Sequence, residues 1–282
     1  MGAHVPVSGG FAAGLGYAAD IGAEAIQVFV SNPRSWALPA GGAAQQAWEA
    51  GAIRDRLAAA GLPVFVHTPY LINVGSADPL IRERSVASMR HALHRGGAIG
   101  ARGVVVHTGS AAGGDRDKSL LYARDCLLPV LDSIPPGGPE LLLEPMAGQG
   151  QMLCATVADL GPYLEMLEWH PRAGVCLDTC HAFSAGLDLA APGGAAAAMS
   201  ELTGVLGGTS RLQLVHANDS KDPCGSHRDR HENIGAGQIG AAPFGELLRH
   251  PAAAGVPFVI ETPGPKPAHA ADIATLQGLR AR

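Results

Sequence analysis

The chain has 282 residues, 47% of them hydrophobic and 16% charged, with a formal net charge of −5. This composition excludes a disordered chain and allows a large apolar core, while the net negative charge argues against non-specific coating of nucleic acid. The sequence contains no run of 18 apolar residues and no secretory signal in MGAHVPVSGG, so we expect neither a membrane span nor export.

Eight short apolar runs, each bounded by turn residues, are typical of parallel strands that are covered on both faces. In chain order they are Ala3–Val5, Ala25–Val30, Pro63–His67, Gly103–His107, Glu140–Glu144, Ala173–Asp178, Leu212–Ala217 and Pro257–Glu261. No Pro-, Gly- or Ser-rich linker divides the chain, so we expect a single catalytic domain over residues 1–282.

Segments with helical spacing lie between these runs. Asp78 and Pro79 offer an N-cap and a first-turn proline for a helix that continues to His94. Further helices are expected over residues 119–134, after a capping box of Thr156 and Asp159, from Pro243, and beyond Pro263. A strand–helix unit repeated eight times predicts an α/β fold, the (β/α)8 TIM barrel, with a doubly wound open sheet as the alternative.

The five cysteines are odd in number and scattered along the chain, which is unlike a disulfide framework. They fit ordinary buried thiols in a reducing compartment, and we therefore expect a cytoplasmic protein. The cysteines are Cys126, Cys154, Cys176, Cys180 and Cys224.

Six of the eight expected strands end in a side chain that can bind a metal ion. They are His67, His107, Glu144, Asp178, His216 and Glu261. Catalytic groups of an α/β barrel gather at the carboxyl ends of its strands, so these six would meet at one mouth. Any one of them alone is more often a hydrogen-bonded structural residue, and only the repeat over six strands indicates function. Three imidazoles with carboxylates favour zinc over magnesium or calcium, with manganese or iron as substitutes.

A second group of polar residues follows the sixth and seventh strands. The motif DTCH places His181 three residues after Asp178, and DRH places Asp229 two residues before His231. These residues can hold another ion, although each short motif alone also fits an ordinary polar loop. Residues 218–240 read as a long, polar, glycine-rich loop, and long loops on this side of a barrel usually carry function.

Together these segments resemble the endonuclease IV family of abasic-site repair enzymes over nearly the whole chain. The resemblance is carried by GAHVPVSGG, HTPYLINVGS, HTGS, LEPMAGQG, CLDTCHAFSAGLDL, HANDSKD, DRHENIGAGQIG and IETPG. It implies a zinc-dependent deoxyribonuclease on a xylose isomerase-like barrel. The enzyme would hydrolyse the phosphodiester bond 5′ to abasic sites in duplex DNA, leaving a 3′-hydroxyl and a 5′-deoxyribose phosphate, and would also clean blocked 3′ ends.

The resemblance also implies a centre of three zinc ions, with Glu144 as the catalytic residue because it bridges two of them. The implied ligands are His67, His107 and Glu144 for the first ion, Glu144, Asp178, His216 and Glu261 for the second, and His181, Asp229 and His231 for the third. The partner would be double-stranded DNA with abasic sites or blocked 3′ ends, bound by a monomer that has no membrane partner.

Four residues are candidates for DNA contacts. Arg34 in NPRSW and Tyr70 in HTPYLIN stand where the family inserts side chains into bent DNA and flips the abasic nucleotide out. Asn73 and Gln149 are weaker candidates. A solvated loop arginine and a tyrosine that anchors its loop are the ordinary structural alternatives for Arg34 and Tyr70.

Pro145 and Met146 depart from the family pattern, in which asparagine and threonine typically follow the glutamate. A proline beside Glu144 removes one backbone N–H donor, and the loss of two polar side chains can alter the groups that orient the metal ligands. We expect metal binding to survive, and substrate range or rate to differ.

A sugar isomerase or epimerase is the alternative function, because such enzymes share the barrel and a Glu/Asp/His/Glu metal set. One divalent ion beside a keto-sugar would then be bound by Glu144, Asp178, His216 and Glu261. This interpretation leaves the other five implied ligands unexplained and predicts one or two metal ions and no DNA cleavage. A third interpretation, a DNA-lesion binding protein with a degenerate site, predicts no bound metal, and the fold alone does not decide among the three.

Overall fold

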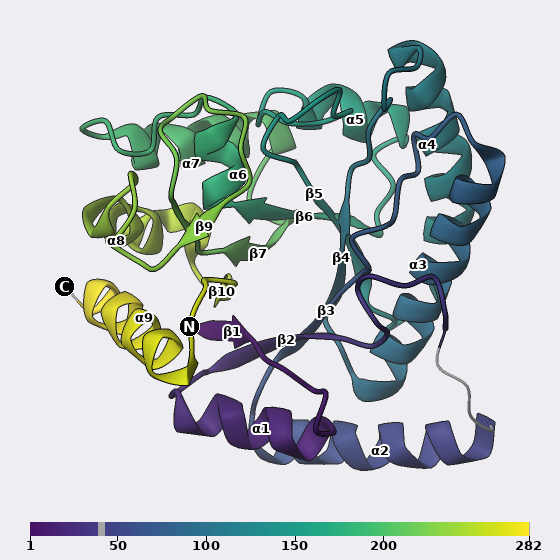
Figure 1. The fold of residues 1–282 in the computed structure, drawn as a ribbon, viewed down its shortest axis with the longest axis horizontal. Coiled ribbons are helices and arrows are strands. Elements are labelled where there is room, and N and C mark those ends of the chain that lie inside the picture. Colours follow the sequence, from purple (N-terminus) through teal and green to yellow (C-terminus); the bar gives the residue numbers. More distant parts are fainter. Residues whose placement is uncertain (39–42, 282) are drawn as a thin grey trace.

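The computed structural model describes residues 1–38 and 43–281. Eight parallel strands pair in the order β1-β10-β7-β6-β5-β4-β3-β2 and close into a barrel, which Figure 1 shows inside a ring of helices. The strands are β1 (Gly2–His4), β2 (Ala25–Phe29), β3 (Val64–His67), β4 (Gly103–His107), β5 (Glu140–Glu144), β6 (Ala173–Asp178), β7 (Leu212–His216) and β10 (Phe258–Ile260). The closed circle confirms the predicted (β/α)8 barrel and rules out the doubly wound open sheet.

The ends of these strands differ from the expected ends by at most one residue. The strand β1 begins and ends one residue earlier than expected, at Gly2 and His4, and β10 stops at Ile260, one residue before Glu261. These small shifts leave every expected strand-end side chain at the same mouth of the barrel.

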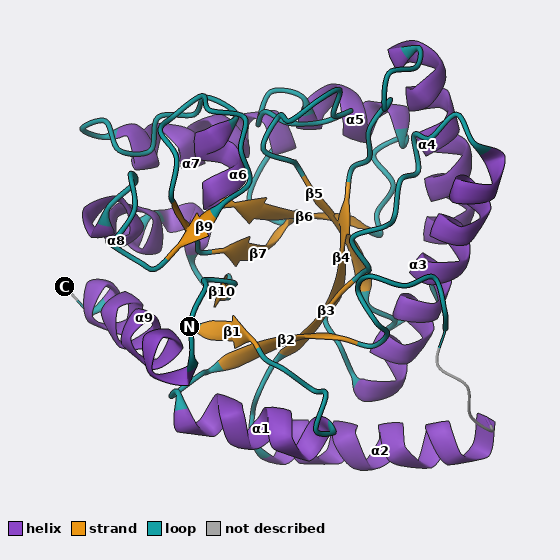
Figure 2. Cartoon of the chain, viewed as in Figure 1, coloured by secondary structure: helices purple, strands orange, loops and turns teal. Residues whose placement is uncertain are grey.

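At least one helix follows each of the eight strands along the chain and covers the barrel from outside (Figure 2). The helices are α1 (Phe11–Asp20), α2 (Ala43–Ala59), α3 (Pro79–Ile99), α4 (Arg116–Asp132), α5 (Leu160–Met166), α6 (Thr179–Ser184), α7 (Gly194–Leu206), α8 (Ala241–Arg249), the 3-10 helix η1 (Pro251–Ala253) and α9 (Lys266–Arg280). Both α6 and α7 follow β6, and α6 begins immediately after the last residue of that strand.

The helix α3 is longer than the sequence pattern predicts. Its start is as expected, because the Asp78 carboxylate accepts a hydrogen bond from a first-turn N–H and Pro79 occupies the first position. Its end lies at Ile99 instead of His94, where Gly100 adopts a left-handed conformation (φ 78°) that closes the last turn. The stop signal is therefore the glycine, which lies beyond the apolar periodicity.

Side-chain caps set the starts of α4 and α5, earlier than expected for α4 and as expected for α5. The helix α4 begins at Arg116, three residues earlier than expected, because the Asp115 carboxylate accepts two N–H groups of the first turn, and it ends two residues early. The expected capping box is present, since the Asp159 N–H donates to Thr156 Oγ1 (3.2 Å) and the Thr156 N–H donates to Asp159 Oδ2 (2.9 Å). The regular helix starts just after it, at Leu160.

One apolar layer closes the interior of the barrel. Seven strands each contribute one buried side chain to it, namely Ala25, Phe65, Val105, Leu142, Cys176, Leu214 and Val259. A separate, larger cluster fills the space between the strands and the helices. Because side chains two positions apart on a strand face the same way, the residue two positions after each member of this layer also points into the barrel, nearer its mouth.

The segment after β7 holds a short hairpin that the sequence analysis did not predict. The strands β8 (Asp219–Ser220) and β9 (His231–Glu232) pair antiparallel, with Ser220 opposite His231. The expected long polar loop is therefore divided into a loop between these strands and a second loop that leads to α8.

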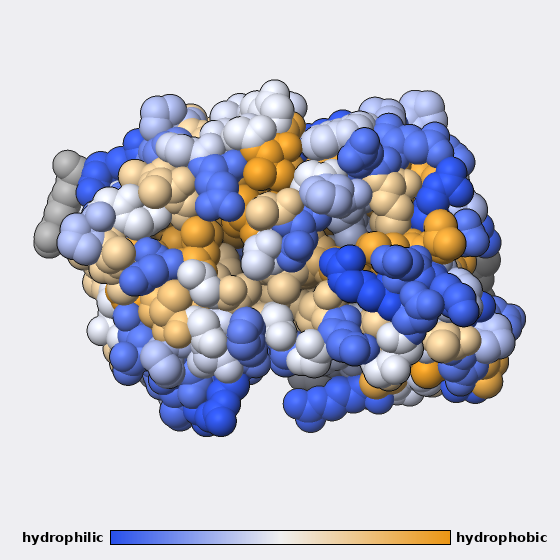
Figure 3. Space-filling view, turned by 90° about the horizontal axis from the view of Figure 1, so that it is seen from above, coloured by the Kyte–Doolittle hydropathy of each residue, from blue (hydrophilic) through white to orange (hydrophobic). Residues whose placement is uncertain are grey.

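The remaining expectations concern cysteines and membranes. All five cysteines are free thiols, four of them buried and Cys224 half-buried, so the expectation that they form no disulfide framework is confirmed. Within the described residues, no helix combines the length and the apolar character that a bilayer crossing requires. Figure 3 shows polar and charged side chains over much of one face of the molecule, with apolar patches between them.

Candidate metal centre

A polar layer lies next to the apolar layer of the barrel, on the side of the mouth. The residue two positions after each of the seven apolar members is Gln27, His67, His107, Glu144, Asp178, His216 or Glu261. Six of these are the metal-capable side chains expected from the sequence. The strand register sets them level with one another, since His107 pairs with Glu144 and Asp178 pairs with His216. The strand period of two residues therefore explains why these groups converge.

The first expected ligand group meets at one carboxylate oxygen. The Nε2 atoms of His67 and His107 each lie 3.4 Å from Glu144 Oε2. Glu144 is fully buried, and its Oε2 atom has no hydrogen-bond partner among the described residues. The two imidazoles and this oxygen thus share a space in which an ion can be coordinated.

The second group gathers around the other oxygen of the same carboxylate. His216 Nδ1 lies 2.9 Å from Glu144 Oε1, 3.4 Å from Glu261 Oε2 and 3.8 Å from Asp178 Oδ2. Because its two oxygens face different groups, Glu144 stands in the position of a bridge between two ions.

The third group forms where α6 faces the loop between β8 and β9. The Nε2 atoms of His181 and His231 each lie 3.1 Å from a carboxylate oxygen of Asp229. Both nitrogens are buried, and neither has a hydrogen-bond partner in the described part of the chain. Asp178 Oδ2 is 3.6 Å from His231 Nε2, so the third group adjoins the second through Asp178.

Backbone carbonyl oxygens orient three of the five imidazoles. In each case Nδ1 lies within hydrogen-bond distance of the carbonyl and is best placed as the donor, which leaves Nε2 free for an ion. The pairs are His67 with Thr68 (2.7 Å), His181 with Pro145 (3.1 Å) and His231 with Glu261 (3.2 Å). The polypeptide itself thus sets the tautomer that metal coordination needs.

Two amide side chains that the sequence analysis missed complete this support. Gln27 Nε2 donates to Glu261 Oε1 (2.6 Å), and Gln27 Oε1 accepts a hydrogen bond from His216 Nε2 (2.9 Å). Asn218 Nδ2 donates to Asp178 Oδ2 (2.7 Å), and its Oδ1 accepts from the Glu261 N–H (2.8 Å). The available signals were a polar residue at an inward position of an apolar run for Gln27, and the segment HANDSKD for Asn218.

The electrostatics keep the carboxylates charged. Burial raises the pKa of Glu144, but His216 and neighbouring histidines hold it well below its usual range. Burial likewise opposes ionisation of Asp229, and the nearby His181 nevertheless lowers its pKa. Burial lowers the pKa of His231, but the adjacent carboxylates raise it to about 9. The carboxylates at the mouth of the barrel therefore stay ionised and can bind cations.

The donor set fits the zinc ions that the sequence implies. Three of its buried atoms have no hydrogen-bond partner among the described residues: Glu144 Oε2, His181 Nε2 and His231 Nε2. An unpaired buried polar atom costs about 1–3 kcal/mol, and coordination of a cation would remove that cost. Mixed imidazole and carboxylate donors suit zinc better than magnesium or calcium.

Comparison with known proteins places the chain in a family. A family model described as xylose isomerase-like TIM barrel matches residues 15–281. A Streptomyces coelicolor protein named "Probable endonuclease 4" is 55% identical over 99% of this chain and 95% of that relative. The chain belongs to the endonuclease IV family. The crystal structure of endonuclease IV from Thermus thermophilus is 30% identical and superposes with a TM-score of 0.83 over 99% of this chain and 97% of that one.

The likeness to sugar epimerases concerns the fold alone. A structure of an L-ribulose 3-epimerase matches 99% of this chain and 93% of its own chain, with a TM-score of 0.71 but only 17% identity. At that identity the shared barrel carries no argument about the reaction. The Streptomyces coelicolor and Thermus thermophilus relatives, at 55% and 30% identity, carry endonuclease names.

Two of the residues expected to contact DNA lie on loops at the mouth of the barrel. The Tyr70 side chain is half-exposed, and its ring centroid lies 5.8 Å from that of His67 and 6.2 Å from that of His107. Burial and the carboxylates of the centre raise the pKa of Tyr70 to about 12, so it remains a hydrogen-bond donor. Arg34 lies exposed on the loop after β2, and the Tyr70 N–H donates to the carbonyl of Pro33 beside it (3.1 Å).

The two weaker candidates have different surroundings. Asn73 Oδ1 accepts hydrogen bonds from the backbone N–H groups of Gly75 (3.1 Å) and Ser110 (2.9 Å), so it joins the loops after β3 and β4. Gln149 Oε1 is buried without a hydrogen-bond partner in the described chain. The structure therefore gives Asn73 a role within the protein and leaves Gln149 with an unused acceptor.

Although Pro145 departs from the family pattern, its backbone still supports the candidate metal centre. The proline lacks an N–H, but its carbonyl oxygen lies 3.1 Å from His181 Nδ1. Met146 is buried, and its N–H donates to the Cys154 carbonyl (3.1 Å). Since a backbone oxygen orients His181, the side-chain changes at these two positions leave that ring in place.

Proposed function

We propose that the chain hydrolyses the phosphodiester bond 5′ to abasic sites in duplex DNA, leaving a 3′-hydroxyl and a 5′-deoxyribose phosphate, with three bound zinc ions. The observation that carries this proposal is the convergence of nine side chains in three adjoining groups at one barrel mouth, in a chain of the endonuclease IV family. The proposed ligands are His67, His107, Glu144, Asp178, His181, His216, Asp229, His231 and Glu261. The same centre would clean blocked 3′ ends.

The protein residues would hold and orient the reacting groups. When bound, the zinc ions supply an activated water and neutralise charge that develops on phosphate oxygens. Glu144 would help to hold the first two ions, while Gln27 and Asn218 fix the orientation of neighbouring side chains of the site. Asp229, His181 and His231 would hold the third ion, which would neutralise charge on the leaving oxygen.

Recognition of the lesion would follow from extrusion of the abasic nucleotide. A nucleotide without a base has no pairing and little stacking to lose, so it leaves the helix at low cost. We assign Arg34 and Tyr70 to the bent duplex, with Asn73 and Gln149 as further contacts. The half-exposed ring of Tyr70 beside two proposed zinc ligands supports this assignment. The chain would act in the cytoplasm as a monomer with one catalytic domain.

The substitution Glu144→Gln tests the proposal. The amide keeps the shape of the carboxylate but loses the charge that bridges two cations, so incision of a duplex with one tetrahydrofuran abasic analogue should fall below detection. Binding of the same duplex, measured by fluorescence anisotropy, should remain. The exposed Glu201→Gln on α7 is a matched control that should keep full activity. An active Glu144→Gln enzyme would refute the bridging role.

A further inference from the structure

Asp229 reaches the third ligand group from the loop that joins β8 to β9, and His231 reaches it from the first position of β9. Backbone hydrogen bonds attach the tip of this loop to the end of α6, from Gly225 N–H to the Phe183 carbonyl (3.1 Å) and from His227 N–H to the Ser184 carbonyl (2.9 Å). The same short helix carries His181. The tip of the loop is therefore fixed relative to His181, one ligand of the group, whereas other contacts must fix the base of the loop.

An ion pair closes the base of the loop. Arg230 Nε donates to Asp222 Oδ2 (2.6 Å) while Arg230 Nη2 donates to Asp222 Oδ1, so the guanidinium binds both carboxylate oxygens. Next to this pair, the Lys221 N–H donates to the Arg230 carbonyl (2.9 Å), which extends the ladder of β8 and β9. A two-pronged arginine–carboxylate pair fixes direction as well as distance.

The two partners of the pair differ in burial. Only 8% of the Asp222 side chain is exposed, whereas half of the Arg230 side chain is. Ser220 Oγ donates to the Asp222 carbonyl (2.8 Å), so the acidic residue is also held by its backbone. Asp222 is thus the fixed partner, and Arg230 is the residue whose direction the pair determines.

Arg230 lies between two proposed ligands in the sequence and faces away from both. Its guanidinium contacts Asp222, whereas the carboxylate of Asp229 and the ring of His231 contact each other and His181. Neighbouring side chains of an extended segment point to opposite sides. Holding Arg230 on one side consequently turns the residues before and after it toward the third ion.

We propose that Asp222 is a positioning residue for the third metal ion, acting through Arg230 to preorganise Asp229 and His231. This inference rests on the proposed trinuclear centre. Without the pair, the base of the loop would have to be ordered when the ion binds, and that ordering weakens binding. Loss of a residue that orients metal ligands typically lowers metal affinity about 10- to 100-fold.

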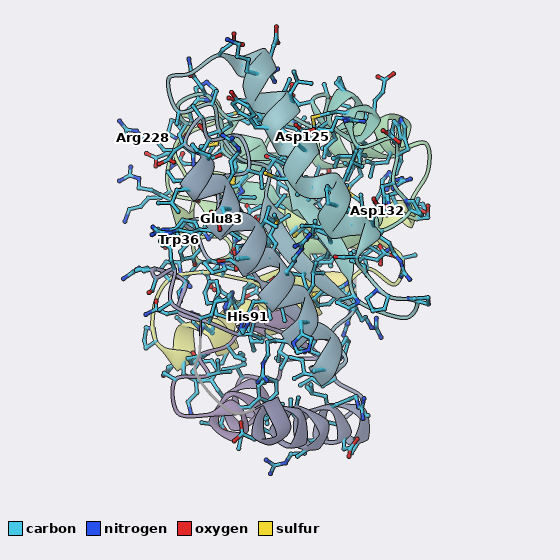
Figure 4. The ribbon with its side chains drawn as sticks, turned by 90° about the vertical axis from the view of Figure 1, so that its right-hand side faces the viewer. Trp36, Glu83, His91, Asp125, Asp132 and Arg228 are labelled. Carbon is cyan, nitrogen blue, oxygen red and sulfur yellow. The ribbon has the colours of Figure 1, made fainter. Side chains whose placement is uncertain are left out.

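The test compares Asp222→Ala with Asp222→Glu and with the control Arg228→Gln. Arg228 also faces Asp222, but at 3.7 Å and with a largely exposed side chain. Figure 4 shows Arg228 at the same end of the barrel as Trp36, opposite Asp132. The readouts are the zinc content at buffered free zinc, the dissociation constant of the weakest ion by chelator competition, and the unfolding temperature of the metal-free proteins.

We expect Asp222→Ala to bind the weakest ion about 10- to 100-fold less tightly while the other two ions and the metal-free unfolding temperature stay unchanged. Asp222→Glu should recover most of the affinity, and Arg228→Gln should match the wild type. Unchanged affinity in Asp222→Ala would overturn the inference, and so would an equal loss of all ions together with a lower metal-free unfolding temperature. A wild-type protein that binds fewer than three zinc ions would instead refute the trinuclear centre. The inference about Asp222 is judged separately, on the difference in zinc affinity between the variant and the wild type.

Discussion

Gln27 belongs to the polar layer of the barrel without being a candidate metal ligand. Its amide oxygen accepts from His216 Nε2, which leaves His216 Nδ1 facing Glu144 and Glu261. Its amide nitrogen donates to Glu261 at the same time. One buried side chain therefore sets the ring orientation of one proposed ligand and the carboxylate orientation of another.

Replacing Gln27 with Met tests this role, because Met keeps the length of the side chain and loses the hydrogen bonds to His216 and Glu261, together with the contact to His4 Nδ1 (3.0 Å). Zinc affinity should fall about 10- to 100-fold, as measured by chelator competition. The unpaired groups left on His216 and Glu261 should also destabilise the metal-free protein by about 1–3 kcal/mol in urea denaturation. Gln213→Met is the control, since Gln213 lies on β7 next to an inward position and bonds only to the Ser210 carbonyl (2.6 Å). Wild-type zinc affinity in Gln27→Met would contradict the role.

Single residues of the candidate site could be predicted where the residue type and its position at a strand end both indicated a metal ligand. His67, His107 and Glu144 are metal-capable types at strand ends, so the sequence was enough to bring them together, and the structure does so. Gln27 lies within an apolar run, and an amide is not a typical metal ligand. Its part depends on which face of β2 points inward, and that is decided only by closure of the barrel.

The loop between β9 and α8 is organised by a buried carboxylate. Asp219 is fully buried and accepts backbone N–H groups from four residues of this loop and from its own neighbour along the chain. The donors are Ser220, Gly235, Gly237, Ile239 and Gly240. The backbone must approach very closely here, since a Cβ atom on Gly237 would lie 2.4 Å from the Ser220 carbonyl oxygen and 2.5 Å from Asp219 Oδ1.

The substitution Gly237→Ala should therefore be destabilising. The added methyl group forces the backbone away from Asp219 and weakens several of its hydrogen bonds, at an expected cost of about 1–3 kcal/mol in urea denaturation. Gly278→Ala on α9 is the matched control, because nothing lies within 4 Å of its Cβ position and alanine favours the helix, so it should stabilise by up to about 1 kcal/mol. Equal stability of the two variants would contradict the close approach.

The elements were predictable to the extent that their patterns repeat. Each barrel strand, three to six residues long and lying between turn residues, was recognised to within one residue at each end. The hairpin of β8 and β9 has two residues per strand, which is too short for any periodicity, and it forms because the backbone groups of Asp219 and Ser220 meet Glu232 and His231. The helix α6 was missed because its six residues lie within a ligand motif.

Closure of the barrel brings the two ends of the chain together. The strand β1 pairs with both β10 and β2, and α9 packs beside the start of β2 (Figure 1). There, Arg280 binds both carboxylate oxygens of Glu24 at 2.7 and 2.8 Å. This pair links the last described helix to the second strand of the barrel.

The Glu24–Arg280 pair predicts a pH-dependent contribution to stability. Arg280 lowers the pKa of Glu24 to about 2 in the folded chain, against 4.5 for an ordinary glutamate. A lowered folded-state pKa stabilises above the unfolded value, and the effect is lost as pH falls from about 4.5 to about 2. Because the pair is largely exposed, Glu24→Gln should cost only about 0.2–1 kcal/mol at pH 7. Thermal unfolding should show this difference at pH 7 and none at pH 2, whereas a constant difference would contradict the pairing.

The fold of the whole molecule does not by itself determine the proposed chemistry. The closed barrel followed from eight strand–helix units, and it is shared with an epimerase at 17% identity. In this chain, His67 and His107 lie on one side of Glu144, and His181, Asp229 and His231 lie on the other. The sequence contained these residues, but only the closed barrel with its hairpin shows that the three groups adjoin.

Anomalous diffraction at the zinc edge from crystals of the zinc-loaded protein would test the account most directly. We predict three peaks at the mouth of the barrel, two of them on either side of Glu144 and the third between His181 and His231. A single peak with His67 and His107 turned away from it, or peaks remote from these side chains, would contradict the trinuclear centre and the repair function built on it.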